Sequence, residues 1–267
     1  MNSTQIKLIV ILLIGSTTGW GAGCDNCHKD PKYFVEDEKV FNYYQEWLQS
    51  PHKQADLSCS DCHGGNPQAT DMKTGHEGIF TVTDPRSKVN FRNLLETCGR
   101  CHESQVKQFV QSDHYKSLAK SETTSVHAPV CTTCHHSMNR RQDYKVIVDH
   151  KCRFCHYEDN PGELPTIGRE IASILNQLNI SRGYLNWTKL YYKSKDWPEN
   201  SKTEMDRLNA EYHEIVAGLH SFRLRTTEQS SIKLLTALKR VFAKISAEED
   251  VEENANGNKD KKSGVSQ

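Results

Sequence analysis

The residues of this chain that can do chemistry are concentrated in one short repeated pattern, Cys-x-x-Cys-His. The pattern occurs five times, as CDNCH, CSDCH, CGRCH, CTTCH and CRFCH, and all 10 cysteines lie within it. Two thiols at this spacing can add across the vinyl groups of a haem, and the adjacent histidine then binds the haem iron. The sequence therefore predicts five covalently attached haem c groups.

Each of these pentads supplies two attachment sites and one proximal iron ligand. The predicted attachment sites are Cys24, Cys27, Cys59, Cys62, Cys98, Cys101, Cys131, Cys134, Cys152 and Cys155. The predicted proximal ligands are His28, His63, His102, His135 and His156. Structural zinc and disulfide bonds are the alternatives for so many cysteines. Neither alternative requires a histidine directly after every second cysteine, so the pattern favours haem.

A haem in an electron carrier commonly takes a second histidine as its sixth ligand. Of the 13 histidines, those outside the pentads are His52, His76, His114, His127, His136, His150, His213 and His220. Six of them are predicted distal ligands: His52, His76, His114, His127, His150 and His220. His136 directly follows a proximal ligand, which places it poorly for the same haem. Which histidine serves which haem stays open, and no residue is assigned a catalytic role.

The first residues are typical of an export signal. Lys7 gives a short basic start, residues 8–14 are an unbroken apolar run, and residues 15–23 are small or polar apart from Trp20. Seven apolar residues are too few to span a bilayer, so residues 1–23 are predicted to be a cleavable signal peptide, and an uncleaved anchor is the alternative. We expect an exported, periplasmic protein, because c-type haem is attached outside the cytoplasm.

Residues 24–164 are expected to form a loop-rich pentahaem domain. The intervals between pentads leave room for one short helix and a loop per haem. Apolar residues at helical spacing predict helices over residues 36–49 and 103–119, and no alternating strand pattern is present. The fold class is therefore mainly α, with few or no strands.

Residues 165–246 are expected to form a bundle of three helices that packs on the haems. The first covers residues 167–193, and a second begins at the capping box Ser201-x-x-Glu204 and ends near Phe222. Thr226-x-x-Gln229 is predicted to open the third. Residues 247–267 are polar and without pattern, which predicts a disordered tail.

Two segments are similar to known proteins. Residues 47–65, WLQSPHKQADLSCSDCHGG, resemble an element of the superfamily that contains pentahaem cytochrome c nitrite reductase and octahaem hydroxylamine oxidoreductase. A histidine loop at His76 follows, and residues 210–222, AEYHEIVAGLHSF, resemble the family's helix after the last haem. The resemblance implies stacked haems capped by C-terminal helices, and it implies that His52, His76 and His220 are distal ligands.

The chain also departs from this family. The nitrite reductases carry a Cys-x-x-Cys-Lys pentad at the catalytic haem, and no such pentad occurs here. The hydroxylamine oxidoreductases need eight haems, and this chain has five pentads. The resemblance therefore implies an architecture and does not transfer an enzyme activity.

The function that the sequence favours is electron transfer through mostly bis-histidine haems, between a respiratory donor and a terminal reductase or oxidase. The alternative is a small reductase for nitrite, hydroxylamine or a sulfur oxyanion at one five-coordinate haem. The pentad at His28 is the candidate for that open site, because the next histidine is His52.

A third possibility is a subunit of a larger complex or filament. The expected partners are redox proteins and, through the C-terminal helices, a second copy of the chain, with membrane association only through partners. Lysine plus arginine (34) equals aspartate plus glutamate (34), so nothing indicates nucleic-acid binding.

Overall fold

The structure is a computed structural model, and it describes residues 22–34, 38–120, 128–135, 147–152, 156, 164–193 and 199–262. Every regular element in these ranges is helical, which confirms the predicted mainly α fold. The elements are α1 (Ala22–His28), η1 (Pro31–Phe34), α2 (Glu38–Leu48), α3 (Pro51–Gln54), α4 (Cys59–His63), α5 (Met72–Gly75), α6 (Leu94–Gly99), α7 (Glu103–Phe109), α8 (Asp113–Lys120), α9 (Cys131–His135), η2 (Ile147–Cys152), α12 (Leu164–Tyr191), α13 (Glu199–Leu219) and α14 (Leu224–Lys262).

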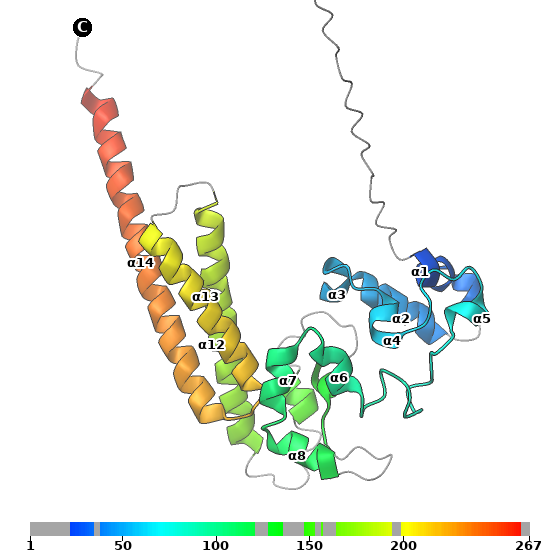
Figure 1. The fold of residues 1–267 in the computed structure, drawn as a ribbon. Helices are drawn as coiled ribbons and strands as arrows, with labels where there is room; N and C mark the ends of the chain where they lie inside the picture. The colour runs from blue at the N-terminus through cyan, green and yellow to red at the C-terminus, as the bar shows by residue number, and fades with distance from the viewer. Residues whose placement is uncertain are drawn as a thin grey trace, which may run out of the picture. The chain divides into compact units, whose positions relative to one another are not determined.

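The chain divides into two compact units, residues 1–79 and 80–267 (Figure 1). The first unit holds two pentads, and the second holds the other three together with the C-terminal helices. The sequence indicated a division near residue 165 instead. Most of the predicted signal peptide lies outside the described residues, and α1 begins at Ala22.

In the first unit, one tryptophan connects the helices around the second pentad. Trp47, on α2, is 4% exposed, and its Nε1 donates a hydrogen bond to the carbonyl of Leu57 at 2.9 Å. The buried Ser50 hydroxyl donates to the Trp47 carbonyl and accepts from the backbone N–H of Lys53, which caps α3. These bonds hold α2, α3 and the start of α4 together.

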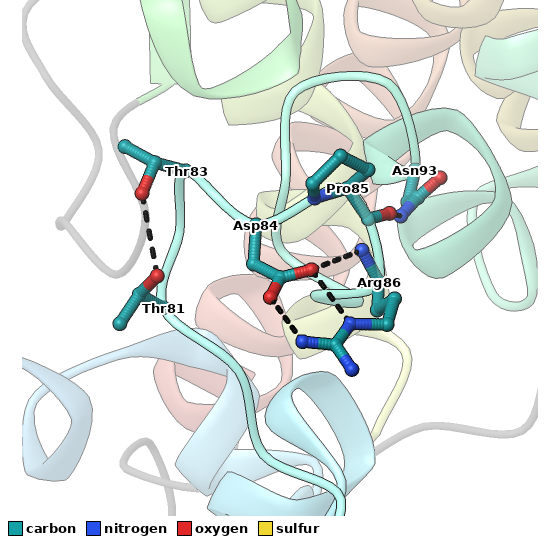
Figure 2. Close-up of polar contacts among 6 residues, drawn as sticks. All are labelled: Thr81, Thr83, Asp84, Pro85, Arg86 and Asn93. Atoms are coloured by element: carbon teal, nitrogen blue, oxygen red, sulfur yellow. Dashed lines mark hydrogen bonds and ion pairs between the residues drawn. The ribbon is translucent and has the colours of Figure 1, made fainter.

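Residues 80–93, which open the second unit and lead into α6, form a series of turns that side-chain hydrogen bonds stabilise. The Asp84 carboxylate accepts bonds from the backbone N–H, Nε and Nη2 of Arg86 (Figure 2). Asn93 donates to the carbonyls of Pro85 and Ser87, both at 2.8 Å. These hydrogen bonds therefore hold the turns that precede α6 in place.

Residues 103–119, predicted as one helix, form two. Helix α7 ends at Phe109 and α8 begins at Asp113. The buried Ser112 hydroxyl accepts a bond from the backbone N–H of Tyr115 at 3.1 Å, which is a helix N-cap. The prediction of a single helix was wrong because Ser112 starts a new helix.

The three C-terminal helices lie side by side around an apolar core (Figure 1). Its most deeply buried members are Ile174, Leu208, Leu234 and Leu238, at 0 to 1% exposure. Two side-chain hydrogen bonds join α12 to α14: Ser173 donates to Glu228 at 3.3 Å, and Ser231 donates to Gln177. The predicted three-helix region is therefore confirmed.

The ends of these helices differ from the prediction. Ser201 lies inside α13, which begins at Glu199, so Ser201 does not cap it. Helix α14 begins at Leu224 and continues to Lys262, past the ends of its neighbours (Figure 1). The predicted disordered tail is thus helical over residues 247–262, because extending a formed helix costs far less than starting one. No helix within the described ranges has the length and apolar character needed to cross a bilayer.

Replacing Leu234 with alanine should lower the free energy of unfolding by about 2 to 5 kcal/mol, because a fully buried leucine leaves a cavity. Ile232→Ala is the matched control on the same helix, since Ile232 is 47% exposed. Denaturant unfolding followed by far-UV circular dichroism measures both variants. Equal losses would contradict the described core.

Asp84→Asn should speed trypsin cleavage after Arg86 at pH 8. Hydrogen bonds from Arg86 lower the pKa of Asp84 to about 2, so the carboxylate is fully ionised and holds the guanidinium at that pH. The pair is present above the unfolded pKa of about 3.9 and is lost as the pH falls through about 2. Asp113→Asn, which frees Lys116 on helix α8, is the control. An unchanged cleavage rate after Arg86 in Asp84→Asn would contradict this.

Candidate haem-binding sites

The pentads adopt a local structure that suits attachment to one porphyrin. Helices α1, α4 and α9 each end on the histidine of their pentad, at His28, His63 and His135. In a helix, positions i, i+3 and i+4 lie on one face. Both thiols and the imidazole of such a pentad therefore face the same side.

A second histidine stands opposite the first pentad. The ring centroids of His28 and His76 are 6.0 Å apart, with the ring planes at 47°. His76 is the C-cap of α5, and its Nδ1 lies 2.8 Å from the carbonyl oxygen of Met72. A carbonyl only accepts, so Nδ1 carries the proton and Nε2 is left as the atom that can bind a metal.

Two glycines allow the chain to place His76 there. Gly65 has φ of +80°, and a Cβ on it would lie 2.5 Å from the Gly75 carbonyl oxygen. Gly23, at the start of α1, has a similar role, because its Cβ would lie 2.2 Å from the Pro67 carbonyl oxygen. Backbone therefore packs directly on backbone around this pentad, which only glycine permits.

The fourth pentad faces the end of a C-terminal helix. The ring centroids of His135 and His220 are 6.0 Å apart, with the ring planes at 21°. His220 directly follows α13, and its Nδ1 lies 3.0 Å and 3.2 Å from the carbonyl oxygens of Val216 and Ala217. The bundle thus contributes a histidine to the pentad region, and its Nδ1 is anchored as in His76.

The fifth pentad faces the start of α8. The centroids of His114 and His156 are 6.0 Å apart, with the rings at 63°. The ring edge of Phe222 contacts His114, at 4.3 Å between centroids and 88°. Arg223 donates to the Gln111 side chain at 3.2 Å, which joins this segment to the turn between α13 and α14.

The repeated 6.0 Å separation is the spacing that an iron between two imidazoles requires. A histidine nitrogen binds a first-row metal at about 2.0 to 2.1 Å, and the ring centre lies roughly 1.1 Å further, so two axial imidazoles have centroids about 6.2 Å apart. All three pairs match this value. The residues present therefore fit haem, with His28 and His76, His114 and His156, and His135 and His220 as the pairs that would hold it.

Neighbouring pentads also approach each other. The Cys24 and Cys59 thiols lie close enough to affect each other's pKa, and burial raises the pKa of Cys59 to about 12. Cys98 lies close enough to Cys131 to lower the pKa of the Cys131 thiol to about 7. Each contact joins two successive pentads, so the first and second pentads are neighbours in space, and so are the third and fourth.

The histidines of these sites favour the neutral form. Burial is the main cause that lowers the pKa of His28, His63, His114, His135 and His220. The facing histidine adds to the effect for His28, His114 and His135. Neutral imidazole is the form that binds a metal, so the sites are set for ligation at neutral pH.

The other predicted ligands are placed as follows. His52 lies in α3 and belongs to none of the three ring pairs. His150 lies in η2, and the structure does not describe its side chain. His127, His136 and Cys155 lie outside the described residues. His102 lies near His135 and His220, whose pKa values it lowers further.

Two features of the sites were not found from the sequence. One is the pairing itself, which joins residues far apart in the chain. The other is the set of backbone carbonyls that anchor His76 and His220; a histidine directly after a helix is the signal that could have indicated them. The first pentad was the candidate for an open site, and the facing His76 ring argues against that interpretation.

Comparison with known proteins gives one kind of relative. The chain is 24% identical over 122 residues to a C-type polyheme cytochrome OmcB of Geobacter sulfurreducens, in strain DL-1 / KN400 and equally in strain ATCC 51573 / DSM 12127 / PCA. The match covers 45% of this chain and 14% of the relative, so the chain spans only a small part of that protein's length. No family model matches the chain, and no solved structure matches it significantly.

The pentads, the paired imidazoles and this similarity agree on one class. Together they indicate a multihaem c-type cytochrome. The nitrite reductase and hydroxylamine oxidoreductase superfamily, which the sequence resembles, is not among the matches.

Gly65→Ala should disturb the His28–His76 pair. The new methyl group collides with the Gly75 carbonyl and displaces the segment that carries His76. Gly78→Ala is the matched control, since Gly78 also has positive φ (+77°) but has nothing within 4 Å of its Cβ position. Gly65→Ala should show a high-spin ferric absorption feature and a larger loss of stability than Gly78→Ala. Identical spectra for both would contradict the placement of His76.

Proposed function

We propose that this protein is an exported pentahaem c-type cytochrome that transfers electrons between redox partner proteins. Haem, when bound, supplies one-electron redox chemistry at its iron. The observation that carries the proposal is the set of three facing imidazole pairs at 6.0 Å. Two imidazoles on one iron leave no open position, which suits electron transfer and not substrate binding.

The chain's own residues support this role by holding ligands rigidly. His76 and His220 are each fixed at a helix end through Nδ1, so their rings keep one orientation. His114 is fixed through α8, which Ser112 caps. Ligands that do not move when the iron changes its charge keep the reorganisation small.

The contacts between pentads support passage of electrons along the chain. The Cys24–Cys59 and Cys98–Cys131 contacts bring the attachment points of successive groups together. His28 and His63 are close enough for one to lower the pKa of the other, as are His102 and His135. Within each unit the residues therefore hold neighbouring groups at short range.

The remaining parts of the proposal come from the sequence. Five pentads give the haem number, and the short apolar run at residues 8–14 gives export to the periplasm. We infer a respiratory donor and a terminal reductase or oxidase as partners, because two histidines on one iron would leave no substrate position at the three paired sites.

Replacing His76, His114 or His220 with alanine should each convert about one of the five haems to a high-spin form, because one iron loses its sixth ligand. His213→Ala is the matched control for His220→Ala: His213 lies on α13, is exposed, and packs on Tyr212. Ferric absorption and electron paramagnetic resonance (EPR) spectra measure the change, and a pyridine haemochrome assay should return five haems per chain.

The proposed function and the enzyme alternative predict different responses to added anions. Under the proposed function, the native protein should be low-spin at the three paired sites and should not change there on addition of cyanide or nitrite. A high-spin signal that shifts with these anions and disappears in His28→Ala would place an open substrate site at the first pentad. That outcome would overturn the proposed function.

A further inference from the structure

The three facing histidines differ in what lies behind their rings. Nδ1 of His76 donates to the Met72 carbonyl, and Nδ1 of His220 donates to the Val216 carbonyl. Nδ1 of His114 is buried and has no hydrogen-bond partner among the described residues. With Nε2 as the ligating atom in all three, only His114 would lack an acceptor among the described residues for its remaining N–H.

This difference changes the electron density that each histidine gives to iron. An Nδ1–H that donates to a carbonyl makes the imidazole a stronger base, and a stronger donor stabilises the ferric iron. A histidine without an acceptor stabilises the ferric form less, so the ferrous form gains. The reduction potential at the His114 site is therefore raised relative to the other two.

The surroundings of His114 act in the same direction. The Phe222 ring covers the imidazole edge-on, and an apolar neighbour disfavours the extra charge of ferric iron. Arg223 lies next to Phe222 in sequence and is a fixed positive charge on that side. Asp113, next to His114 in sequence, acts in the opposite direction, but its carboxylate is 94% exposed and bonds Lys116, so water and the lysine weaken its effect.

We propose that the His114–His156 pair forms the site of highest reduction potential among the three paired sites. This inference rests on the proposed function, because it assumes a haem between each pair. In a reductive titration with dithionite, this site then accepts the first electron of the three, one electron taking its iron from ferric to ferrous. Phe222 and the unpartnered Nδ1 of His114 are the features that set this potential.

The test is a spectroelectrochemical titration of the haem-loaded wild-type protein and of His114→Met. Methionine in place of histidine raises the potential of the haem it ligates. The wave that moves upward in His114→Met should be the highest of the three paired waves in the wild-type protein. If a lower wave moves instead, the proposed order is wrong.

A second variant tests the cause. Phe222→Asn places an amide oxygen beside His114, and Phe222 has φ of +56°, a conformation that asparagine adopts more readily than phenylalanine. This variant should lower the same wave, because Nδ1–H gains an acceptor. Phe222→Leu, which adds no acceptor, should leave that wave at or near its wild-type position. A downward shift of equal size in both variants would show that the missing hydrogen bond does not set the potential.

EPR spectra identify the site independently. Nearly parallel axial imidazoles separate the two iron orbitals that they contact, and strongly crossed imidazoles leave these orbitals close in energy. The 63° pair should therefore give a low-spin signal of larger maximum g than the 21° pair. The larger-g signal should be the one lost in His114→Met. Loss of a different signal would overturn the assignment, whereas a wild-type protein without low-spin signals would instead overturn the proposed function.

Discussion

The structure depends on one distance, the separation between two facing imidazole rings. An iron ligated by two histidines would place the two ring centroids about 6.2 Å apart. Three pairs in this chain stand at 6.0 Å. The turns, caps and close backbone contacts of both units serve to hold that spacing.

Helix ends position the histidines at this separation. A proximal histidine is the last residue of a short helix that also carries its two thiols, as in α1, α4 and α9. Two of the facing histidines, His76 and His220, follow a helix and use its last carbonyls as anchors. A helix end is suited to this because its carbonyls have no partner within the helix. His114 lies at a helix start instead, where carbonyls of that kind are absent.

The two cysteines and the proximal histidine of each site could be predicted from the sequence because they lie close together in the chain. The two thiols and the histidine are within five residues of each other, so spacing alone defines them. The mainly α fold and the three C-terminal helices were also predictable, because apolar residues such as Leu238 and Ile245 recur at helical spacing. The sequence named His76, His114 and His220 among six candidate distal ligands, and the structure places their rings 6.0 Å from those of proximal histidines.

The facing histidines could not be assigned to their pentads from the sequence, because each pair joins separate helices and loops. The break at Ser112 was missed, since a serine inside an apolar pattern reads equally well as a helix residue or as a cap. The helical extension of α14 to Lys262 was missed because its residues are individually polar, while the helix depends on a core established further upstream. In both cases tertiary packing decided between local alternatives.

The most direct test is an experimental structure of the haem-loaded protein with anomalous diffraction recorded at the iron edge. The iron peaks of the first, fourth and fifth pentads should lie between His28 and His76, between His135 and His220, and between His156 and His114. Iron at any of these pentads with a different sixth ligand, or with an open position, would contradict the pairing and the conduction role that follows from it.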